Sequence, residues 1–408
     1  MTLNCYILSM NLKQQHTNFA SKLMITNKIK KMKVIFVVQG EGRGHLTQAL
    51  ALEKALEEKG HQVIEILVGK SKSRQLPDFF LQRAKAPVDT FWSPNFLPSK
   101  KNQHIGLTRS MAYNFMKSSD YLQSIQQLYQ HIQWSGADLV VNFYEILTGL
   151  TYAFFRPSVP EVCIGHQYMF MHPQYRFPHQ HTTARWLMLA FTRATCWGAA
   201  HKLALSFRKM PDCDKQHLSV VPPLLREEVL DISRHRDDFI TGYIINAGFS
   251  EMVKQWHQAH PHVKLHFFWD KADAEEVTKI DDTLTFHRID DTKFLHYLAN
   301  CRAYATTGGF ESVCEAMYMG KPVLMVPAHI EQECNAHEAS LEGAGIKADT
   351  FDISQLIDFT YEHSEDIEFR MWENTAKMMI VSRLEAVVER SLHIGRRSWS
   401  VRRMFSHS

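Results

Sequence analysis

The sequence predicts an α/β protein built from two doubly wound, Rossmann-like parallel-sheet domains that face each other across a cleft. The chain has 408 residues, too many for one ordinary core and suited to two domains. Short apolar runs alternate with segments of helical periodicity in both halves. A proline-containing stretch at 220–225 and a charge-rich stretch at 226–238 separate the halves. We therefore predict an N-terminal domain at 32–225 and a C-terminal domain at 226–395.

The N-terminal half opens with a βαβ pattern, the unit of a parallel doubly wound sheet. Residues 33–38 (KVIFVV) are a buried-strand run, and apolar residues then recur at three and four positions from Leu46 to Leu56. Gly60 ends this helix, and 62–68 (QVIEILV) is the next strand. Further strands are expected at 138–143 and 162–164.

The pattern restarts after the break and continues to the end of the second half. Strands are expected at 240–246, 263–269, 284–287, 302–306 and 322–326, with helices at 310–319 and 335–341. The last helices of 226–395 are expected to pack back on the protein. Residues 1–31 are predicted to be a disordered extension, and 396–408 a basic, frayed tail.

Composition excludes several classes of function. Lys plus Arg number 46 against 43 for Asp plus Glu, so the net charge of +3 gives no global footprint for nucleic acid. The seven Cys are odd in number and include no C-x-x-C pair, which argues against a disulfide framework or zinc site and favours a reducing, cytoplasmic setting. No apolar run approaches the ~20 residues that span a bilayer. We predict a cytoplasmic protein, soluble or peripheral at the inner face of a membrane.

The loop after the first strand reads G-E-G-R-G-H, and its glycines Gly40, Gly42 and Gly44 permit close backbone approach. Its spacing is not that of a dinucleotide fingerprint, and no acid follows the second strand, so NAD binding is disfavoured. His45 is then either an ordinary residue of a tight turn or a general base at a helix start, where the helix end keeps the imidazole neutral. Glu145 is a candidate to orient the imidazole, with a surface carboxylate as the alternative.

A second loop follows the strand that ends at Thr306. Gly308 and Gly309 expose backbone amides just before a helix begins near Phe310. Amides together with the positive end of a helix form an anion site suited to a diphosphate. Polar side chains that converge on this cradle are Ser312, Glu315, Glu331, Gln332 and Asn335.

The segment 307–335 resembles the donor-binding signature of GT-B glycosyltransferases, specifically the family 28 group that includes the peptidoglycan N-acetylglucosaminyltransferase. The matching residues are Gly308, Gly309, Ser312, Glu315, Ala316, Gly320, Pro322, Val326, Pro327, Gln332 and Asn335. The first loop is similar to the family's G-x-G-H loop at Gly42, Gly44 and His45. The resemblance covers most of 32–390, with 70–220 matching only in general layout.

The resemblance implies a role for each of these residues. Glu315 would hold the donor ribose, Gly309 and Ser312 the diphosphate, and Gln332 with Glu331 and Asn335 the sugar hydroxyls. The segment 287–289, with Arg288 and Ile289, would flank the base, and the loop 246–250, with Gly248 and Ser250, would approach the diphosphate from the other side. The resemblance also implies catalysis without a bound metal or cofactor, in keeping with the absence of a D-x-D motif. Helix amides would stabilise the leaving diphosphate instead.

The predicted function is that of an inverting hexosyltransferase (EC 2.4 type) that moves a sugar from a nucleotide-diphosphate donor, with a UDP-sugar favoured, to an acceptor hydroxyl. A nucleotide-sugar 2-epimerase and a non-catalytic nucleotide-sugar-binding subunit are the alternatives. Residues 156–209 contain interleaved aromatics and seven basic residues against one acid, Glu161; the basic residues are Arg156, Arg176, Arg185, Arg193, Lys202, Arg208 and Lys209.

This basic segment has two interpretations. It is either an anionic-membrane face for a lipid-linked acceptor or cell-envelope glycan precursor, or a set of buried helices with solvated cations. The sequence identifies neither the base, the sugar, the acceptor nor the oligomeric state.

Overall fold

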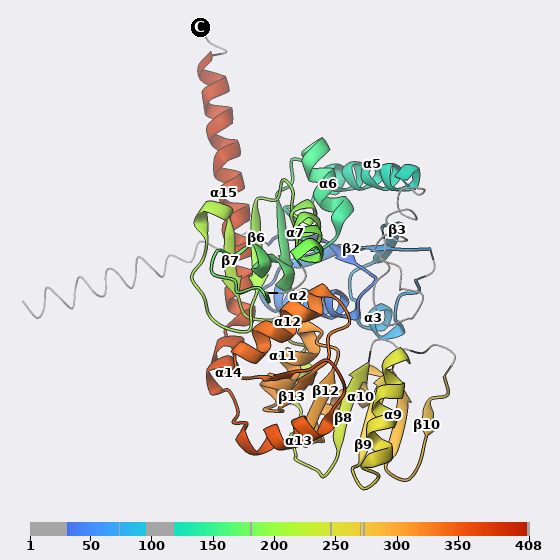
Figure 1. Ribbon diagram of the computed structural model, residues 1–408. Helices are drawn as coiled ribbons and strands as arrows, with labels where there is room; N and C mark the ends of the chain where they lie inside the picture. Colours follow the sequence, from blue (N-terminus) through green and yellow to red (C-terminus); the bar gives the residue numbers. More distant parts are fainter. Residues whose placement is uncertain are drawn as a thin grey trace, which may run out of the picture.

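The computed structural model describes residues 31–72, 74–94, 118–179, 182–244, 247–269, 271 and 274–405. It contains two parallel-sheet α/β domains, one above the other in Figure 1, so the predicted fold class is confirmed. Apart from Lys31, the predicted N-terminal extension lies outside the described residues, as does Asn246 of the loop at 246–250.

The N-terminal domain contains a parallel sheet with the strand order β3-β2-β1-β4-β5-β6-β7. Helices on both faces bury the central strands, which is why they read as continuous apolar runs. The strands are β1 (Lys33–Gln39), β2 (Gln62–Lys70), β3 (Val88–Trp92), β4 (Leu139–Phe143), β5 (Glu161–Gly165), β6 (His201–Leu205) and β7 (Leu218–Val221). The helices are α2 (Arg43–Glu58), α3 (Asp78–Arg83), α5 (Ser118–Trp134), α6 (Ile146–Phe155), η1 (His166–Met171), α7 (Thr182–Thr195) and η2 (Asp214–Gln216).

The C-terminal domain has the strand order β10-β11-β9-β8-β12-β13-β14, parallel except for the antiparallel edge strand β10. Its strands are β8 (Ile240–Ile244), β9 (Leu265–Trp269), β10 (Val277–Lys279), β11 (Leu284–Arg288), β12 (Ala303–Thr306), β13 (Val323–Met325) and β14 (Gly345–Lys347). Its helices are α8 (Glu227–Asp231), η3 (Ala247–Phe249), α9 (Ser250–Ala259), α10 (Asp291–Asn300), α11 (Phe310–Tyr318), α12 (Ile330–Leu341), α13 (Ile353–Glu362) and α14 (Ile367–Glu373).

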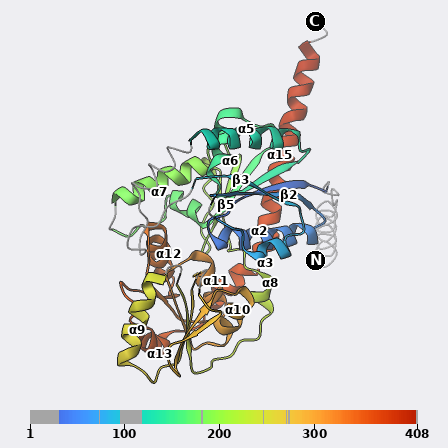
Figure 2. The same cartoon turned by 90° about the vertical axis from the view of Figure 1, so that its right-hand side faces the viewer.

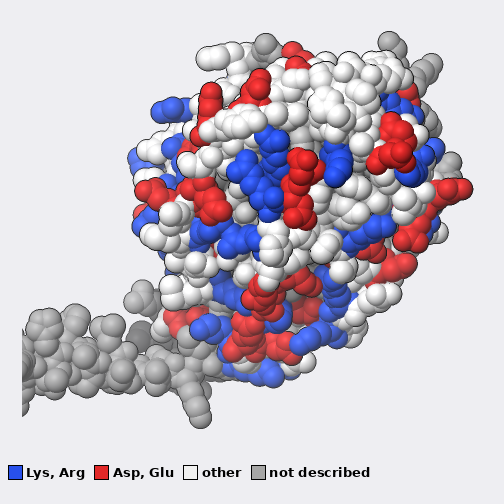
Figure 3. Space-filling model, turned by 90° about the horizontal axis from the view of Figure 1, so that it is seen from below, with Lys and Arg blue, Asp and Glu red and all other residues white. Residues whose placement is uncertain are grey.

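The last helix, α15 (Ala376–Phe405), returns to the N-terminal domain, where it contacts α2 and β7. It then projects beyond that domain (Figures 1 and 2). The segment predicted to be a frayed tail from Arg396 is therefore helical as far as Phe405. From below, the molecule shows positive and negative side chains interspersed, as expected from its nearly balanced charge (Figure 3).

The two domains share one buried hydrophobic cluster. Phe310, the first residue of α11, stacks on His166 of the N-terminal domain with ring centroids 4.0 Å apart, and its ring lies 4.8 Å from that of Phe207. The Tyr175 hydroxyl donates to the Cys334 carbonyl at 3.1 Å, and α12 lies directly below α7 (Figure 2). The strand-to-helix loops of the two sheets are thus held against each other.

Candidate active site

The two glycine-containing loops predicted from the sequence meet at the domain interface. The loop after β1 leads into α2, and the loop after β12 leads into α11. A Cβ added to Gly44 would lie 2.9 Å from Cγ of Glu311, in the first turn of α11. The Gln48 amide donates to the Glu311 carboxylate from the same side. The site is therefore built from both domains.

Gly40 shows why this loop requires glycine. Its N–H donates to the Gly69 carbonyl at 2.8 Å, and an added Cβ would lie only 2.6 Å from Cγ1 of Val68. Gly42 is the N-terminal cap residue of α2, so His45 lies in the first turn of that helix. The close packing of the loop against β2 therefore fixes the position of the first turn of α2, which carries His45.

His45 is surrounded by neutral groups. Its ring stacks on Tyr144 with centroids 5.7 Å apart. Its Nδ1 lies 3.4 Å from Oε1 of Gln48, and its Nε2 lies 3.5 Å from Nε2 of Gln167. Burial lowers the pKa of His45 to about 4, with the Gln48 contact acting in the opposite direction. The imidazole is neutral at pH 7, as expected, but the cause is burial rather than the helix end.

Glu145 does not contact His45, and the expected orienting contact is wrong for this structure. Its carboxylate accepts hydrogen bonds from the Ser93 hydroxyl and from the Thr148 N–H (2.9 Å) and hydroxyl (3.1 Å). These bonds cap the N-terminus of α6, where a side-chain acceptor satisfies a free amide. Burial raises the pKa of Glu145. Glu145 therefore shapes the loop after β4.

The glycine turn after β12 joins the strand to α11 through two glycines of different backbone conformation. Gly308 has φ +84°, a conformation that other L-residues rarely adopt, and an added Cβ would lie 3.3 Å from the Gln332 carbonyl. Gly309 caps α11 with an extended backbone, and an added Cβ there would meet only the Ser312 hydroxyl, at 3.9 Å. That hydroxyl donates to the Gly309 carbonyl at 3.3 Å. The first backbone N–H groups of α11 therefore follow a residue with free space beside it.

Two carboxyl groups of α11 follow this turn, Glu311 half-buried and Glu315 buried. Burial raises the pKa of Glu311 to about 8, although the bond from Gln48 opposes the shift. Glu315 is only 3% exposed and accepts two bonds from Arg226, at 2.7 and 3.1 Å. Arg226 also pairs with Asp291. Glu315 therefore faces Arg226 rather than open space, so binding a ribose would require exchange of this ion pair.

Helix α12 contributes the other three predicted donor residues. The Glu331 carboxylate accepts from the Gln167 amide at 2.9 Å, and burial raises its pKa. Gln332 accepts from the Ala328 N–H at 2.9 Å. Asn335 donates to the Gly308 carbonyl at 3.3 Å, while its buried Oδ1 has no hydrogen-bond partner among the described residues. Asn335 thus supports the glycine turn and keeps one acceptor free.

The remaining predicted donor residues lie at the same edge of the C-terminal sheet, because parallel strands present their carboxyl ends together. Arg288 is the last residue of β11, and the Ile289 N–H donates to the Trp269 carbonyl at 3.1 Å. Gly248 lies in η3 and Ser250 begins α9, both directly after β8.

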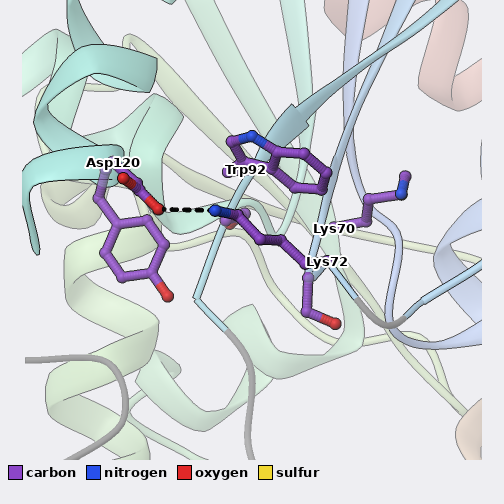
Figure 4. Close-up of a pocket in the computed structure, with 7 residues that line it drawn as sticks. Lys70, Lys72, Trp92 and Asp120 are labelled. Atoms are coloured by element: carbon purple, nitrogen blue, oxygen red, sulfur yellow. Dashed lines mark ion pairs between the residues drawn. The ribbon is translucent and has the colours of Figure 1, made fainter. Parts of the chain in front are cut away.

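A small cavity of about 10 Å³ adjoins the first loop on the side of the N-terminal domain (Figure 4). Lys72 points to Asp120 at 3.2 Å, and the ammonium groups of Lys70 and Lys72 lie 5.1 and 5.4 Å from the centre of the Trp92 ring. The Ser71 N–H, in the cavity wall, donates to the Glu41 carboxylate at 2.6 Å. This cavity has room for about one water molecule.

Four residues of the site were not found from the sequence. Gln48 lies three residues after His45 on one face of α2, a spacing that could have indicated it. Gln167, Tyr144 and Arg226 carry no local signal, since their contacts join segments that are far apart in the chain.

The fold is that of the GT-B class of glycosyltransferases, and solved structures of this class share the architecture. Arabidopsis thaliana UGT89C1 complexed with UDP-L-rhamnose superposes with a TM-score of 0.58 at 15% identity, over 88% of this chain and 99% of that one. For the calicheamicin glycosyltransferase CalG4 the values are 0.53, 16%, 89% and 99%. For LpCGTa in complex with UDP they are 0.55, 13%, 88% and 99%.

The family is shown by the sequence itself. Residues 32–363 match the model of glycosyl transferase family 1, so the chain belongs to that family. Among curated proteins, none matches this sequence. Within the described part of the chain, every helix is too short or too polar to cross a bilayer. The chain is thus a glycosyltransferase of the GT-B type.

Proposed function

We propose that this glycosyltransferase moves a sugar from a nucleotide-diphosphate donor, with a UDP-sugar favoured, to an acceptor hydroxyl with inversion at the anomeric carbon. The observation that carries the proposal is the meeting of His45 and the glycine turn of α11 at one interface, through the approach of Gly44 to Glu311. A base on one domain and an anion cradle on the other are the two parts that such a transfer needs.

The chemistry assigns one task to each side. Nε2 of His45 takes the proton of the acceptor hydroxyl, whose oxygen forms a bond to the anomeric carbon as the bond to the diphosphate oxygen breaks. Attack from the face opposite the leaving group inverts the centre. The amides at the start of α11 stabilise the charge that develops on the departing diphosphate, so no metal is required in this scheme.

The residues proposed to bind the donor are taken from the family resemblance and from the carboxyl ends of the C-terminal strands. UDP-L-rhamnose and UDP accompany two of the similar structures, which supports a UDP-type donor here. In the proposal the diphosphate lies against the cradle, the sugar hydroxyls face α12, and the base lies beside β11. The residues assigned to these contacts are Gly248, Ser250, Arg288, Ile289, Gly308, Gly309, Ser312, Glu315, Glu331, Gln332 and Asn335.

The acceptor is proposed to be lipid-linked or a cell-envelope glycan precursor, reached from the cytoplasm at an anionic membrane surface. The resemblance to family 28 supports this, as do the exposed Trp186 (64%) and Trp197 (58%) in the basic segment. Lys202 is buried in β6, so it does not belong to such a surface. Co-sedimentation with vesicles that does not depend on anionic lipid would contradict the membrane proposal.

The test of the activity is release of nucleotide diphosphate from a panel of UDP-, dTDP- and GDP-sugars, with and without candidate acceptors. We expect release from at least one donor, unchanged by EDTA. A panel in which no donor is consumed would overturn the proposed function, and activity lost on adding EDTA would overturn metal independence. Analysis of the products without acceptor separates transfer from epimerisation at C2 of the sugar.

A further inference from the structure

The surroundings of His45 show a regularity that the general-base proposal does not use. Each ring nitrogen faces the side-chain amide of one glutamine from the same domain, Gln48 at Nδ1 and Gln167 at Nε2. Each of these amides also donates to a half-buried carboxyl group of the opposite domain, Gln48 to Glu311 and Gln167 to Glu331. Two parallel bridges therefore connect the imidazole to the C-terminal domain.

The carboxyl groups fix the orientation of both amides. In both bridges an oxygen of the carboxyl group accepts from the NH₂ end of the glutamine that faces it, and this contact orients the amide. Because Nε2 of Gln48 donates to Glu311, Gln48 presents its Oε1 to the imidazole. Nδ1 of His45 must then carry a proton to donate to this oxygen. With its Nε2 between Glu331 and His45, Gln167 presents a donor, and Nε2 of the imidazole must accept. Both bridges select the same neutral tautomer.

Packing holds both glutamines in place. Gln48 is 2% exposed and Gln167 is 6% exposed. A Cβ on Gly165 would lie 2.8 Å from Oε1 of Gln167, so the glycine leaves room for this amide. The Tyr144 ring covers His45, and its hydroxyl bonds to the Thr192 hydroxyl at 2.8 Å. Among the residues that the structure describes, the two glutamines are the hydrogen-bond partners of the imidazole.

We propose that Gln48 and Gln167 are positioning residues that hold His45 in the Nδ1-protonated tautomer, and that Glu311 and Glu331 set them only when the two domains are closed. This inference rests on the proposed role of His45 as general base. The basic lone pair is then on Nε2, directed at the Gln167 amide, which the acceptor hydroxyl replaces when it binds. The amide takes this position only after the donor-binding domain has docked. The arrangement couples closure over the donor to activation of the base.

The first test needs no substrate. In the protein labelled with ¹⁵N-histidine, the couplings between the ring nitrogens and ring protons identify the tautomer, and the signal absent from His45→Asn assigns His45. We expect the Nδ1-protonated form in the wild type, and a mixture of tautomers in Gln48→Met and in Glu311→Met. An Nε2-protonated wild type, or an unchanged tautomer in both variants, would overturn the proposal.

The second test uses the donor that the panel identifies. Gln48→Met should lower kcat about 10- to 100-fold with little change in donor KM, because a misplaced base affects the reacting step. Glu311→Gln keeps an acceptor oxygen for Gln48 and should retain a higher kcat than Glu311→Met. Gln133→Met is the matched control, since the Gln133 side chain bonds to Ser158 at the surface, away from His45.

Two outcomes separate this inference from the proposed function. The expected tautomer in a protein that consumes no nucleotide sugar would leave the bridges standing and overturn the activity. If the protein is active and Gln48→Met affects kcat and thermal stability no more than the control Gln133→Met does, the proposed role of the two glutamines is wrong. The Glu311 pair of variants leaves both glutamines intact, so it remains informative if Gln48→Met does not fold.

Discussion

The two domains share one sheet topology but place different chemical groups at its carboxyl edge. In each sheet the strand order reverses between two central neighbours, β1 and β4 in the N-terminal domain and β8 and β12 in the C-terminal domain. Loops that leave this point diverge to the two faces of the sheet, which is where ligands of doubly wound sheets bind. The N-terminal loops present an imidazole and amides, whereas the C-terminal loops present a glycine turn and carboxyl groups. The frame fixes the place of a site, and the loops decide its chemistry.

The two sides also differ in charge. On the N-terminal side, burial lowers the pKa of His45 to about 4, so the imidazole is neutral at pH 7. On the C-terminal side, burial raises the pKa of Glu311 to about 8 and also raises that of Glu331. Burial thus shifts the pKa of each group in the direction that favours its uncharged form.

The largest expected effect tests the N-terminal side. His45→Ala should lower kcat for nucleotide-diphosphate release in the presence of acceptor by about 10²- to 10⁴-fold, the usual contribution of a general base. Donor affinity, measured by calorimetry, should change little because the cradle lies on the other domain. His262→Ala, at an exposed position of the C-terminal domain, is the control. Wild-type turnover in His45→Ala would remove this residue from the mechanism.

The next effect tests the C-terminal side. Arg226→Met leaves Glu315 without its guanidinium partner and should lower the free energy of unfolding by about 3–5 kcal/mol, as for other broken buried ion pairs. Urea denaturation measures it. Lys254→Met breaks a surface pair with Glu251 and should cost below about 1 kcal/mol. Equal losses in the two variants would show that the Arg226 pair is solvated.

The sequence predicts the centre of each sheet better than its edges. The runs that became β1, β2 and β4 are long and apolar, and their periodicity is unambiguous. Strand β3 was missed because its residues are half-buried or exposed and carry no continuous apolar run. Strands β10 and β14 have three residues each, too few for a pattern. Strands β6 and β7 were also missed, although their residues are buried.

The site residues also divide into those that a local sequence pattern identifies and those that it does not. His45 and the glycine turn belong to local motifs, so spacing along the chain was enough to single them out. Helix α12 starts at Ile330, before the helical run predicted from Asn335, so Glu331 and Gln332 lie within the helix. Their partners depend on contacts across 164 residues for Gln167 with Glu331 and 263 for Gln48 with Glu311. Contacts this distant are set by the docking of the domains, which no short-range pattern encodes.

The next prediction concerns Glu161, a buried carboxyl group in the core of the N-terminal domain, and the pH dependence of the free energy of unfolding. Burial raises the pKa of Glu161 to about 8, and its Oε1 accepts from the Asn142 amide at 2.8 Å. The folded state then holds a proton that the unfolded state releases near pH 4.5, so stability should fall as pH rises from about 5 to 8.

Glu161→Gln keeps the acceptor oxygen and removes the titration. The difference in unfolding free energy between the wild type and this variant should shift by more than about 1 kcal/mol against the wild type from pH 5 to pH 8. Urea denaturation at four pH values measures this difference. A difference that does not vary with pH would show that Glu161 titrates normally.

The smallest expected effect separates the two glycines of the cradle. Gly308→Ala places a side chain at φ +84° near the Gln332 carbonyl and should cost about 1–2 kcal/mol of stability. Gly309→Ala meets only the Ser312 hydroxyl at 3.9 Å, so it should change stability by less than about 0.5 kcal/mol.

If a diphosphate lies against the backbone here, Gly309→Ala should nevertheless raise donor KM about tenfold, because the methyl group occupies the space of close approach. Gly343→Ala, at φ +75° with open space around it, controls for backbone strain alone. Unchanged donor KM in Gly309→Ala would place the diphosphate elsewhere on the C-terminal domain. It would leave the glycine turn as a purely structural feature, and the comparison between the domains would then rest on His45 alone.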